Sequence, residues 1–253
     1  MPAMSTETVS NNARRLDVHN SEVPVLCRAC EARHRGVCGA LDERQLIALS
    51  KTSSKHTIDP GTELVGAAET IGQYSNVLSG VVKLTKMLSD GRQQIVGLQF
   101  APDFVGRPFR EESEIAAEAA TDVSLCSFPK ASVDRMMREA PELEHRLLTQ
   151  TLKQLDDARD WMVTLGRKTA AEKVASFLLM IARNIDPAVD PNRTKAAFDL
   201  PLTRADIADF LGLTIETVSR QFTKLRSEGV IRIENNRHIE IDDLARLENR
   251  SGD

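Results

Sequence analysis

The sequence predicts an α+β chain with an N-terminal antiparallel β-roll, a long dimerisation helix and a C-terminal winged helix-turn-helix. Three observations predict this fold class. Short β-rich stretches with glycine turns occupy residues 55–130, an unbroken helical pattern follows Pro141, and two capped helices joined at Gly212 come near the end. The 253 residues suffice for two packed domains and a connector.

The composition is that of an ordinary globular protein, with 41% apolar and 28% charged residues. No apolar run approaches the roughly 20 residues of a membrane span, and the N-terminal residues lack the apolar core of an export signal. We therefore expect a cytoplasmic protein with no membrane contact. The net charge of −4 argues against bulk coating of nucleic acid, but one local basic surface would still bind phosphates.

The N-terminal third combines a polar arm with short strands. Residues 1–20 predict a disordered arm, residues 21–40 a cysteine-bearing loop, and residues 42–49 a short helix with acidic residues in its first turn. The stretches that predict strands are residues 74–78, 81–87, 94–100 and 123–128, with turns at 59–61, 79–80 and 89–91. Regular short strands of this kind indicate a small antiparallel barrel or roll.

Residues 132–138 predict a short helix, and Pro141 then begins a second helix that nothing breaks before residue 165. One stripe on this helix repeats at spacings of 3 and 4, which is typical of a coiled-coil seam. Its members are Leu148, Thr151, Leu155, Ala158, Met162 and Leu165. The stripe predicts a homodimer interface. Leu147 and Leu152 widen it, so the same pattern also fits a helix packed on its own roll.

A third helix is expected over residues 170–184, followed by an exposed loop over 186–195 and a last unit from about Phe198. In that unit Thr203 caps a helix and Asp206, three residues on, completes a capping box. Gly212 permits the left-handed conformation that ends the helix, and Thr214 caps the next one.

Two short helices joined in this way predict a helix-turn-helix. The second helix is expected to stop at Gly229, before two strands with Asn235 and Asn236 at their turn. Asparagine tolerates the positive φ of tight hairpins, so this segment predicts a two-stranded wing.

Residues at the start of the second helix have the chemistry of base recognition. Glu216, Ser219 and Arg220 share one face by their spacing, and a recognition helix contacts base edges with such N-terminal residues. Arginine can bond both guanine acceptors and glutamate can accept from cytosine. Three further residues are expected to hold phosphates, namely Thr214, Gln221 and Lys224. An amphipathic hairpin with a solvated charged face is the alternative interpretation, but the cap, the glycine and the wing together favour DNA binding.

The segment ETVSR at 216–220, the helix before it and the wing resemble the DNA-binding domain of the CRP–FNR regulators. The likeness extends upstream through the dimer helix and the roll. Cyclic-AMP receptor proteins carry an arginine just before the glutamate, whereas this chain has Ile215 there and Ser219 before Arg220, as in the FNR branch. The resemblance implies a regulator that reads a palindrome with TTGAT-like half-sites and contacts RNA polymerase, with the hairpin at 90–94 as a polymerase-facing loop by family analogy.

Cyclic-nucleotide rolls hold the phosphate with a Gly-Glu and, some ten residues on, an Arg-Ser-Ala. The matching stretch here is FVGRPFREESEIAAEAA at 104–120, which presents Glu111, Glu112 and Glu114 instead. Carboxylates there are expected to repel a phosphate, so no cyclic nucleotide is expected.

The cysteines suggest a different ligand for the sensor. Cys27, Cys30 and Cys38 cluster in the N-terminal loop, and Cys126 stands alone in a predicted strand of the roll. Four thiolates suit either a zinc site or an iron–sulfur cluster, and their spacing does not distinguish the two. Four unrelated buried thiols would not explain a C-x2-C in a polar loop.

The resemblance favours the cluster, because FNR-type proteins hold a [4Fe–4S] cluster with three N-terminal cysteines and one in the roll. Some FNR relatives have fewer residues before the third cysteine. The expected protein is an oxygen-responsive anaerobic transcription regulator that binds DNA as a homodimer. A cluster-free or zinc-stabilised regulator that answers to another small molecule or partner is the alternative. No paired catalytic carboxylates or nucleophile–base pair stand out, so an enzyme is not expected.

The expected domains are the arm (1–20), the cluster loop (21–40), the sensor roll (41–132), the dimerisation helix (133–166) and the winged-helix domain (167–253).

Overall fold

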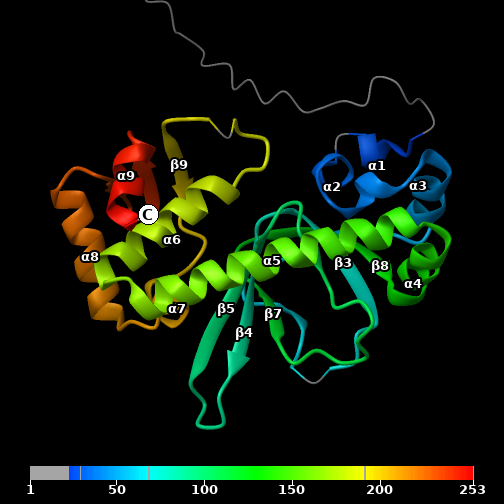
Figure 1. Ribbon diagram of the computed structural model, residues 1–253, viewed down its shortest axis with the longest axis horizontal. Coiled ribbons are helices and arrows are strands. Elements are labelled where there is room, and N and C mark those ends of the chain that lie inside the picture. Colours follow the sequence, from blue (N-terminus) through cyan, green and yellow to red (C-terminus); the bar gives the residue numbers. More distant parts are fainter. Residues whose placement is uncertain (1–22, 29, 68, 191, 253) are drawn as a thin grey trace, which may run out of the picture.

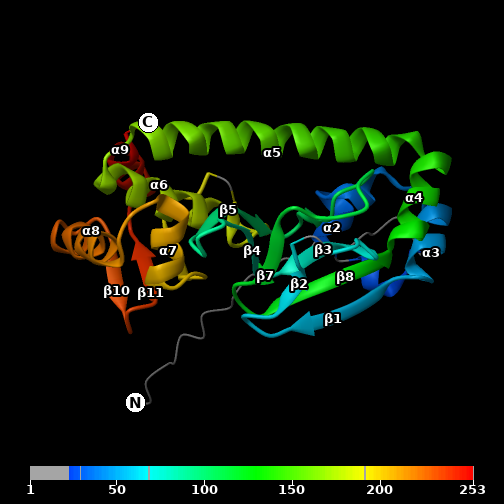
Figure 2. The same cartoon turned by 90° about the horizontal axis from the view of Figure 1, so that it is seen from below.

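The computed structural model describes residues 23–28, 30–67, 69–190 and 192–252, so the arm expected over 1–20 lies outside the described residues. The long helix α5 (Pro141–Arg167) runs along one side of the molecule, with the roll against one half and a helical domain against the other (Figures 1 and 2). Within the described part of the chain, no helix is long and apolar enough to cross a bilayer.

The predicted antiparallel roll is confirmed, and it consists of two four-stranded sheets. One sheet has the order β1-β8-β3-β6 and the other β2-β7-β4-β5, with antiparallel pairing throughout. The strands are β1 (Ser54–Ile58), β2 (Glu63–Val65), β3 (Gln73–Ser79), β4 (Val81–Met87), β5 (Gln93–Phe100), β6 (Phe104–Val105), β7 (Ala116–Ala119) and β8 (Val123–Pro129). Val77, Val82, Val123 and Leu125 are buried between the sheets and hold them together.

The prediction of a loop over residues 21–40 is wrong for the described part of this segment, which forms three short helical turns. These are α1 (Val25–Arg28), α2 (Glu31–His34) and the 3-10 turn η1 (Val37–Ala40). Each turn is too short to be stable alone, so local sequence gives no helix signal. Tertiary packing supplies the stability instead, since Val37 and Cys38 are buried in one core with residues of β3, α4 (Lys130–Glu139) and α5.

The helices expected around the roll are confirmed with small shifts. α3 (Glu43–Ser50) starts after the capping box of Asp42 and Gln45, and Pro141 occupies the first turn of α5. Leu143 and Leu147 are buried on one side of α5, where they join the core of the roll. The opposite side exposes a stripe of large apolar side chains, each between 45% and 72% exposed: Leu148, Leu152, Leu155, Met162 and Val163. Of the other predicted seam residues, Thr151 and Ala158 are exposed and Leu165 is half-buried.

The C-terminal domain contains the predicted helix-turn-helix and wing, together with two elements that were not predicted. Its elements are α6 (Ala170–Asn184), β9 (Ala196–Asp199), α7 (Arg204–Leu211), α8 (Ile215–Ser227), β10 (Arg232–Glu234), β11 (His238–Ile241) and α9 (Leu244–Ser251). The prediction of a two-stranded wing is wrong in the number of strands. β9 pairs with β11, so the sheet has three strands in the order β10-β11-β9. The missed helix α9 packs on α6.

The roll and the C-terminal domain share one apolar core. Val81, Ile95 and Phe100 of the roll are buried in the same cluster as the interior of α6, α7 and α8. Trp161 of α5 packs edge-on against Phe210 of α7, with ring centroids 4.7 Å apart. Because these contacts bury apolar area on both sides, the orientation of the C-terminal domain depends on the roll.

A glycine substitution tests the connection between β3 and β4. Gly80 has φ of +85°, and a Cβ there would lie 2.2 Å from the carbonyl oxygen of Asp122. Gly91, at the β4–β5 hairpin, has the same φ of +85° with nothing within 4 Å. We expect Gly91→Ala to lower the free energy of unfolding by about 1–2 kcal/mol through backbone strain alone. Gly80→Ala, which also forces the backbone to shift, should cost roughly 3 kcal/mol or more in a denaturant titration. Equal losses in the two variants would contradict this account of the turn.

Candidate functional site

The helix-turn-helix is built by the caps that the sequence predicts. The hydroxyl of Thr203 accepts from the backbone N–H of Asp206, whose side chain accepts from Thr203 in return. Gly212 ends α7 with φ of +60°, and the Thr214 hydroxyl then accepts from the N–H of Thr217 at the start of α8. Val218, on the inner side of α8, is fully buried in the core. The turn thus fixes how α8 is presented.

The outer face of α8 carries the residues expected to read DNA. Glu216, Ser219 and Arg220 are all exposed, as are Thr214 and Lys224. Gln221 is half-buried, so its predicted contact with phosphate has less freedom than the others.

The charges on this face are arranged by local hydrogen bonds. At the N-terminus of α8, the backbone N–H of Glu216 and the Thr214 hydroxyl hold the pKa of the Glu216 carboxyl below its usual value. This glutamate is therefore an ionised acceptor at neutral pH. The Nη2 of Arg220 lies 3.5 Å from the hydroxyl oxygen of Thr217. The other N–H groups of this guanidinium can donate to an acceptor on DNA.

The wing lies beside α8 and ends in the expected tight turn. Asn235 and Asn236 have φ of 50° and 58°, the left-handed values that asparagine tolerates. Arg204 of α7 stacks on the buried ring of Phe222 at 3.5 Å from the ring centroid, a support for α8 that the sequence analysis missed. No periodic or cap signal marks such a contact, because it depends on how α7 and α8 cross.

The four cysteines come from the N-terminal turns and from the middle of the roll. Cys27 lies in α1, Cys30 immediately precedes α2, Cys38 lies in η1, and Cys126 lies in β8 between the paired strands β1 and β3. All four are free thiols. Cys38 is buried and the other three are half-buried, with Cys126 packed against the same core as Cys38.

The pKa values of these thiols depend on burial and on one another's charges. Burial raises the pKa of Cys38 well above its usual range, and the charges of Cys30, Cys126 and Cys27 raise it further. Burial likewise raises the pKa of Cys126 to about 11, again with contributions from Cys30 and Cys27. For Cys27, burial and the charge of Cys30 raise the pKa. The structure packs Cys38 and Cys126 on one core, and the charges of Cys27 and Cys30 act on both of them. Charging all four thiols without a metal is therefore unfavourable.

The fit of a metal can be judged from the spacing of these side chains. Zinc bonds thiolate sulfur at about 2.3 Å, so four sulfurs around one zinc lie about 3.8 Å apart. Among the described residues, which include all four cysteines, no three His, Cys, Asp or Glu side chains lie close enough to hold a single metal ion. A cluster of four irons and four sulfides separates its cysteines further, and its ligands are cysteine thiolates. The donor set of four cysteine thiolates fits such a cluster.

The segment between Cys30 and Cys38 contacts the rest of the molecule at two points. The guanidinium of Arg35 donates to the carbonyl of Pro187, in the loop between α6 and β9. The guanidinium of Arg146, on α5, donates to the carbonyl of Arg35 at 2.7 Å. The cysteine-bearing segment thus contacts both the long helix and the C-terminal domain of its own chain. No sequence pattern indicates these contacts.

A second link between the two domains runs through a lysine. Lys83 of β4 lies 3.0 Å from both Glu118 of β7 and Asp206 of α7. Burial alone would lower the pKa of Lys83, but the hydrogen bonds to these two carboxylates raise it above its usual value. Asp206 belongs to the capping box of α7, so the start of the helix-turn-helix is tied directly to the roll.

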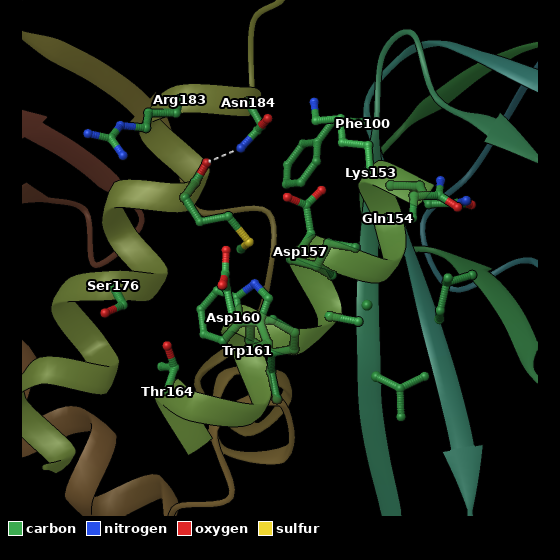
Figure 3. A pocket seen from close by; sticks show the side chains of 18 of the residues that line it. Phe100, Lys153, Gln154, Asp157, Asp160, Trp161, Thr164, Ser176, Arg183 and Asn184 are labelled. Carbon is green, nitrogen blue, oxygen red and sulfur yellow. Dashed lines mark hydrogen bonds between the residues drawn. The ribbon is translucent and has the colours of Figure 1, made fainter. Parts of the chain in front are cut away.

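A cavity of about 630 Å³ lies where α5, β5 and α6 meet. Figure 3 shows Phe100, Asp157 and Trp161 around it, with Ser176 and Arg183 on α6 across from them. The contacts between the two domains therefore leave an open cavity at their junction.

A second cavity, of about 540 Å³, opens between the roll and the N-terminal half of α5. The glutamates expected to repel a phosphate, Glu111, Glu112 and Glu114, are not among its lining residues, whereas Arg107 and Arg110 are. That no cyclic nucleotide binds here stays a prediction.

The hairpin between β4 and β5 was expected to face polymerase with residues 90–94. Asp90 and Arg92 are exposed and pair with each other at 2.8 Å. Gln93 and Gln94, however, donate to Asp209 and to the carbonyl of Phe210 in α7. Two of the five residues at 90–94 are thus engaged by the C-terminal domain of the same chain.

Comparison with known proteins agrees with this architecture. The Crp-like helix-turn-helix domain matches residues 172–250, and the cyclic nucleotide-binding domain matches residues 55–140. The chain is 56% identical over 238 residues to a Rhizobium leguminosarum bv. viciae protein named "Probable transcriptional activator", covering 92% of this chain and 98% of that one. It is 42% identical over 237 residues to the transcriptional activator protein FnrL of Cereibacter sphaeroides, covering 92% and 95%.

The solved structure of FixK2 from Bradyrhizobium japonicum superimposes with a TM-score of 0.70 at 32% identity, covering 78% of this chain and 96% of that one. These relatives are transcription regulators, and the helix-turn-helix that defines their DNA-binding domain is present here with its caps and its exposed face. The chain therefore belongs to the CRP–FNR family and is a DNA-binding transcriptional activator, not an enzyme.

Proposed function

We propose that this protein is an oxygen-responsive activator of the FNR branch, acting in the cytoplasm. In this proposal a homodimer binds a palindromic site with TTGAT-like half-sites while Cys27, Cys30, Cys38 and Cys126 hold a [4Fe–4S] cluster. One observation carries the proposal: Cys38 of the N-terminal turns and Cys126 of β8 pack on one core, where Asn76 donates to the first and lies opposite the second in strand register. The similarity to FnrL supports it.

When bound, the cluster supplies an oxygen-labile cross-link between the N-terminal turns and the roll. The chain itself does the rest. The turns that carry the first three cysteines contact α5 through Arg146 and the C-terminal domain through Pro187. Ordering of these turns thus stabilises one position of the C-terminal domain, and their release removes that bias.

At the DNA, α8 enters the major groove with Glu216, Ser219 and Arg220 toward the base edges. Arg220 supplies the bidentate donors that a guanine accepts, and the ionised Glu216 accepts from a cytosine amino group. Two such helices must stand about 34 Å apart to read successive half-sites. The exposed stripe of α5 provides the symmetric contact that sets this distance.

A cluster-free regulator that responds to a small molecule is the second candidate. The cavity of about 540 Å³ in the roll favours it, since its size suits a small ligand. Analysis of anaerobically purified protein distinguishes the two functions. Iron with acid-labile sulfide supports the first, and their absence supports the second.

Replacing the ligand from the roll tests the cluster. Cys126→Ser should abolish acid-labile sulfide in anaerobically purified protein, because β8 positions no other thiolate from the roll. Ser127→Ala, at the next position of β8, is the matched control and should keep both iron and sulfide. Retention of a full cluster in Cys126→Ser would refute the ligand assignment.

Truncating one side chain on α8 tests DNA reading. Arg220→Ala should weaken binding to a palindromic site by about 1–3 kcal/mol in fluorescence anisotropy, while weak non-specific binding persists. Arg226→Ala, on the same helix and also exposed, removes an identical charge away from the reading face. It should lower specific and non-specific binding alike. An unchanged specific affinity in Arg220→Ala would overturn the assignment of the reading face.

A charge placed in the exposed stripe tests the dimer. Leu155 is 45% exposed on α5, and Leu155→Glu should convert the dimer to a monomer in multi-angle light scattering, since a dimer would bury that carboxylate. Thr149→Glu adds the same charge beside the stripe and should remain dimeric. A dimeric Leu155→Glu protein would show that another surface joins the subunits.

A further inference from the structure

Asn76 lies between the cysteine from the roll and a cysteine from the N-terminal turns. It is located on β3, directly opposite Cys126 of β8 in the strand register. Its side-chain amide donates to the Sγ of Cys38 at 3.2 Å. The residue is only 1% exposed, so this hydrogen bond is shielded from water. Two cysteines from different parts of the chain therefore share one buried amide as a neighbour.

The other end of this amide has no partner. The Oδ1 of Asn76 is buried without a hydrogen bond. A buried carbonyl oxygen in this state destabilises a fold, so a leucine of similar size would suit the core better. The asparagine is thus not explained by packing, and its one side-chain hydrogen bond goes to a cysteine sulfur.

We propose that Asn76 is the positioning residue of the cysteine site, whose amide N–H holds the Cys38 sulfur in place and slows release of the bound cluster. The inference rests on the proposed function. A thiolate ligand is an acceptor without a donor of its own, so an N–H beside it both orients the sulfur and offsets part of its charge. Outer partners of this kind change metal affinity by roughly 10- to 100-fold when they are removed.

Of the four thiols, Cys38 has the most to gain from such a partner. It is the buried member of the set, whereas Cys27, Cys30 and Cys126 are half-buried and reached by solvent. A charged sulfur far from water depends on protein donors, and Asn76 is the side chain whose donor bond to it the structure shows.

Two substitutions that remove the donor but differ in volume test the proposal. Asn76→Leu fills the site and Asn76→Ala leaves space, so their effects on packing differ while the loss of the N–H is common to both. Ser75→Ala is the matched control. It removes a buried hydrogen bond of 2.7 Å to Ser127 from the neighbouring position of β3 without touching a cysteine.

Iron release to a chelator is followed under strict anoxia on full-length protein, with the visible absorption spectrum recorded beforehand. We expect both Asn76 variants to release iron roughly tenfold faster than the unmodified protein and Ser75→Ala to match the unmodified protein.

We also expect the sulfur-to-iron absorption of both Asn76 variants to move to longer wavelength, because the hydrogen bond lowers the energy of the sulfur lone pairs. A purely structural role would not move this band.

Release rates and spectra of both Asn76 variants that equal those of Ser75→Ala would overturn the inference while leaving the proposed function intact. Unmodified protein that contains no iron and no sulfide would instead overturn the proposed function, and the inference with it. If Asn76→Leu fails to fold, the release rate and spectrum of Asn76→Ala alone decide whether the inference holds. Near-ultraviolet circular dichroism then checks that Asn76→Ala is folded.

Discussion

The position of Cys126 in the middle of β8 is the constraint on which the proposed sensor depends. Hydrogen-bonded strands flank β8 on both sides, so this sulfur cannot move without disrupting a sheet. In the proposed site the other three cysteines must therefore come to it, and they lie on helical turns stabilised by burying Val37 and Cys38. In this proposal Cys126 is a fixed ligand in the roll, and the other ligands lie on a segment docked outside it. Occupancy of such a site can alter the order of the segment without unfolding the domain.

Two sets of contacts then connect the roll to the DNA-reading helix. The shared core and the Lys83 bridge hold the start of α7 against the roll, and Arg35 connects the cysteine segment to the loop after α6. The first set combines a buried apolar core with a partly buried ion pair, whereas the hydrogen bond of Arg35 in the second set is exposed. Such a difference suits a switch, because weak exposed contacts can be lost while the fold is kept. The open cavity in Figure 3 lies at the junction of the two domains.

Local signals in the sequence predict the DNA-binding part well. Thr203, Asp206, Gly212 and Thr214 mark the helix ends because caps act over three or four residues, and the structure has those caps. The four cysteines were also identified as candidates, because their residue type is itself informative.

The features that could not be predicted depend on packing between distant segments of the chain. The turns over residues 25–40, the strand β9, and the partners of Cys38 and Pro187 all come from contacts between segments far apart in the chain. The exposed stripe of α5 includes Leu152 and Val163 besides the predicted seam, since only the structure shows which side faces the roll.

The most direct test of the account is the affinity of one anaerobic preparation for palindromic DNA, measured before and after exposure to air. Iron and sulfide are assayed on the same sample. We predict tight, sequence-specific binding under anoxia that falls to the non-specific level as sulfide is lost. Specific binding that stays equally tight in air, by protein that never contained iron, would contradict the central claim that these cysteines control how the recognition helices meet DNA.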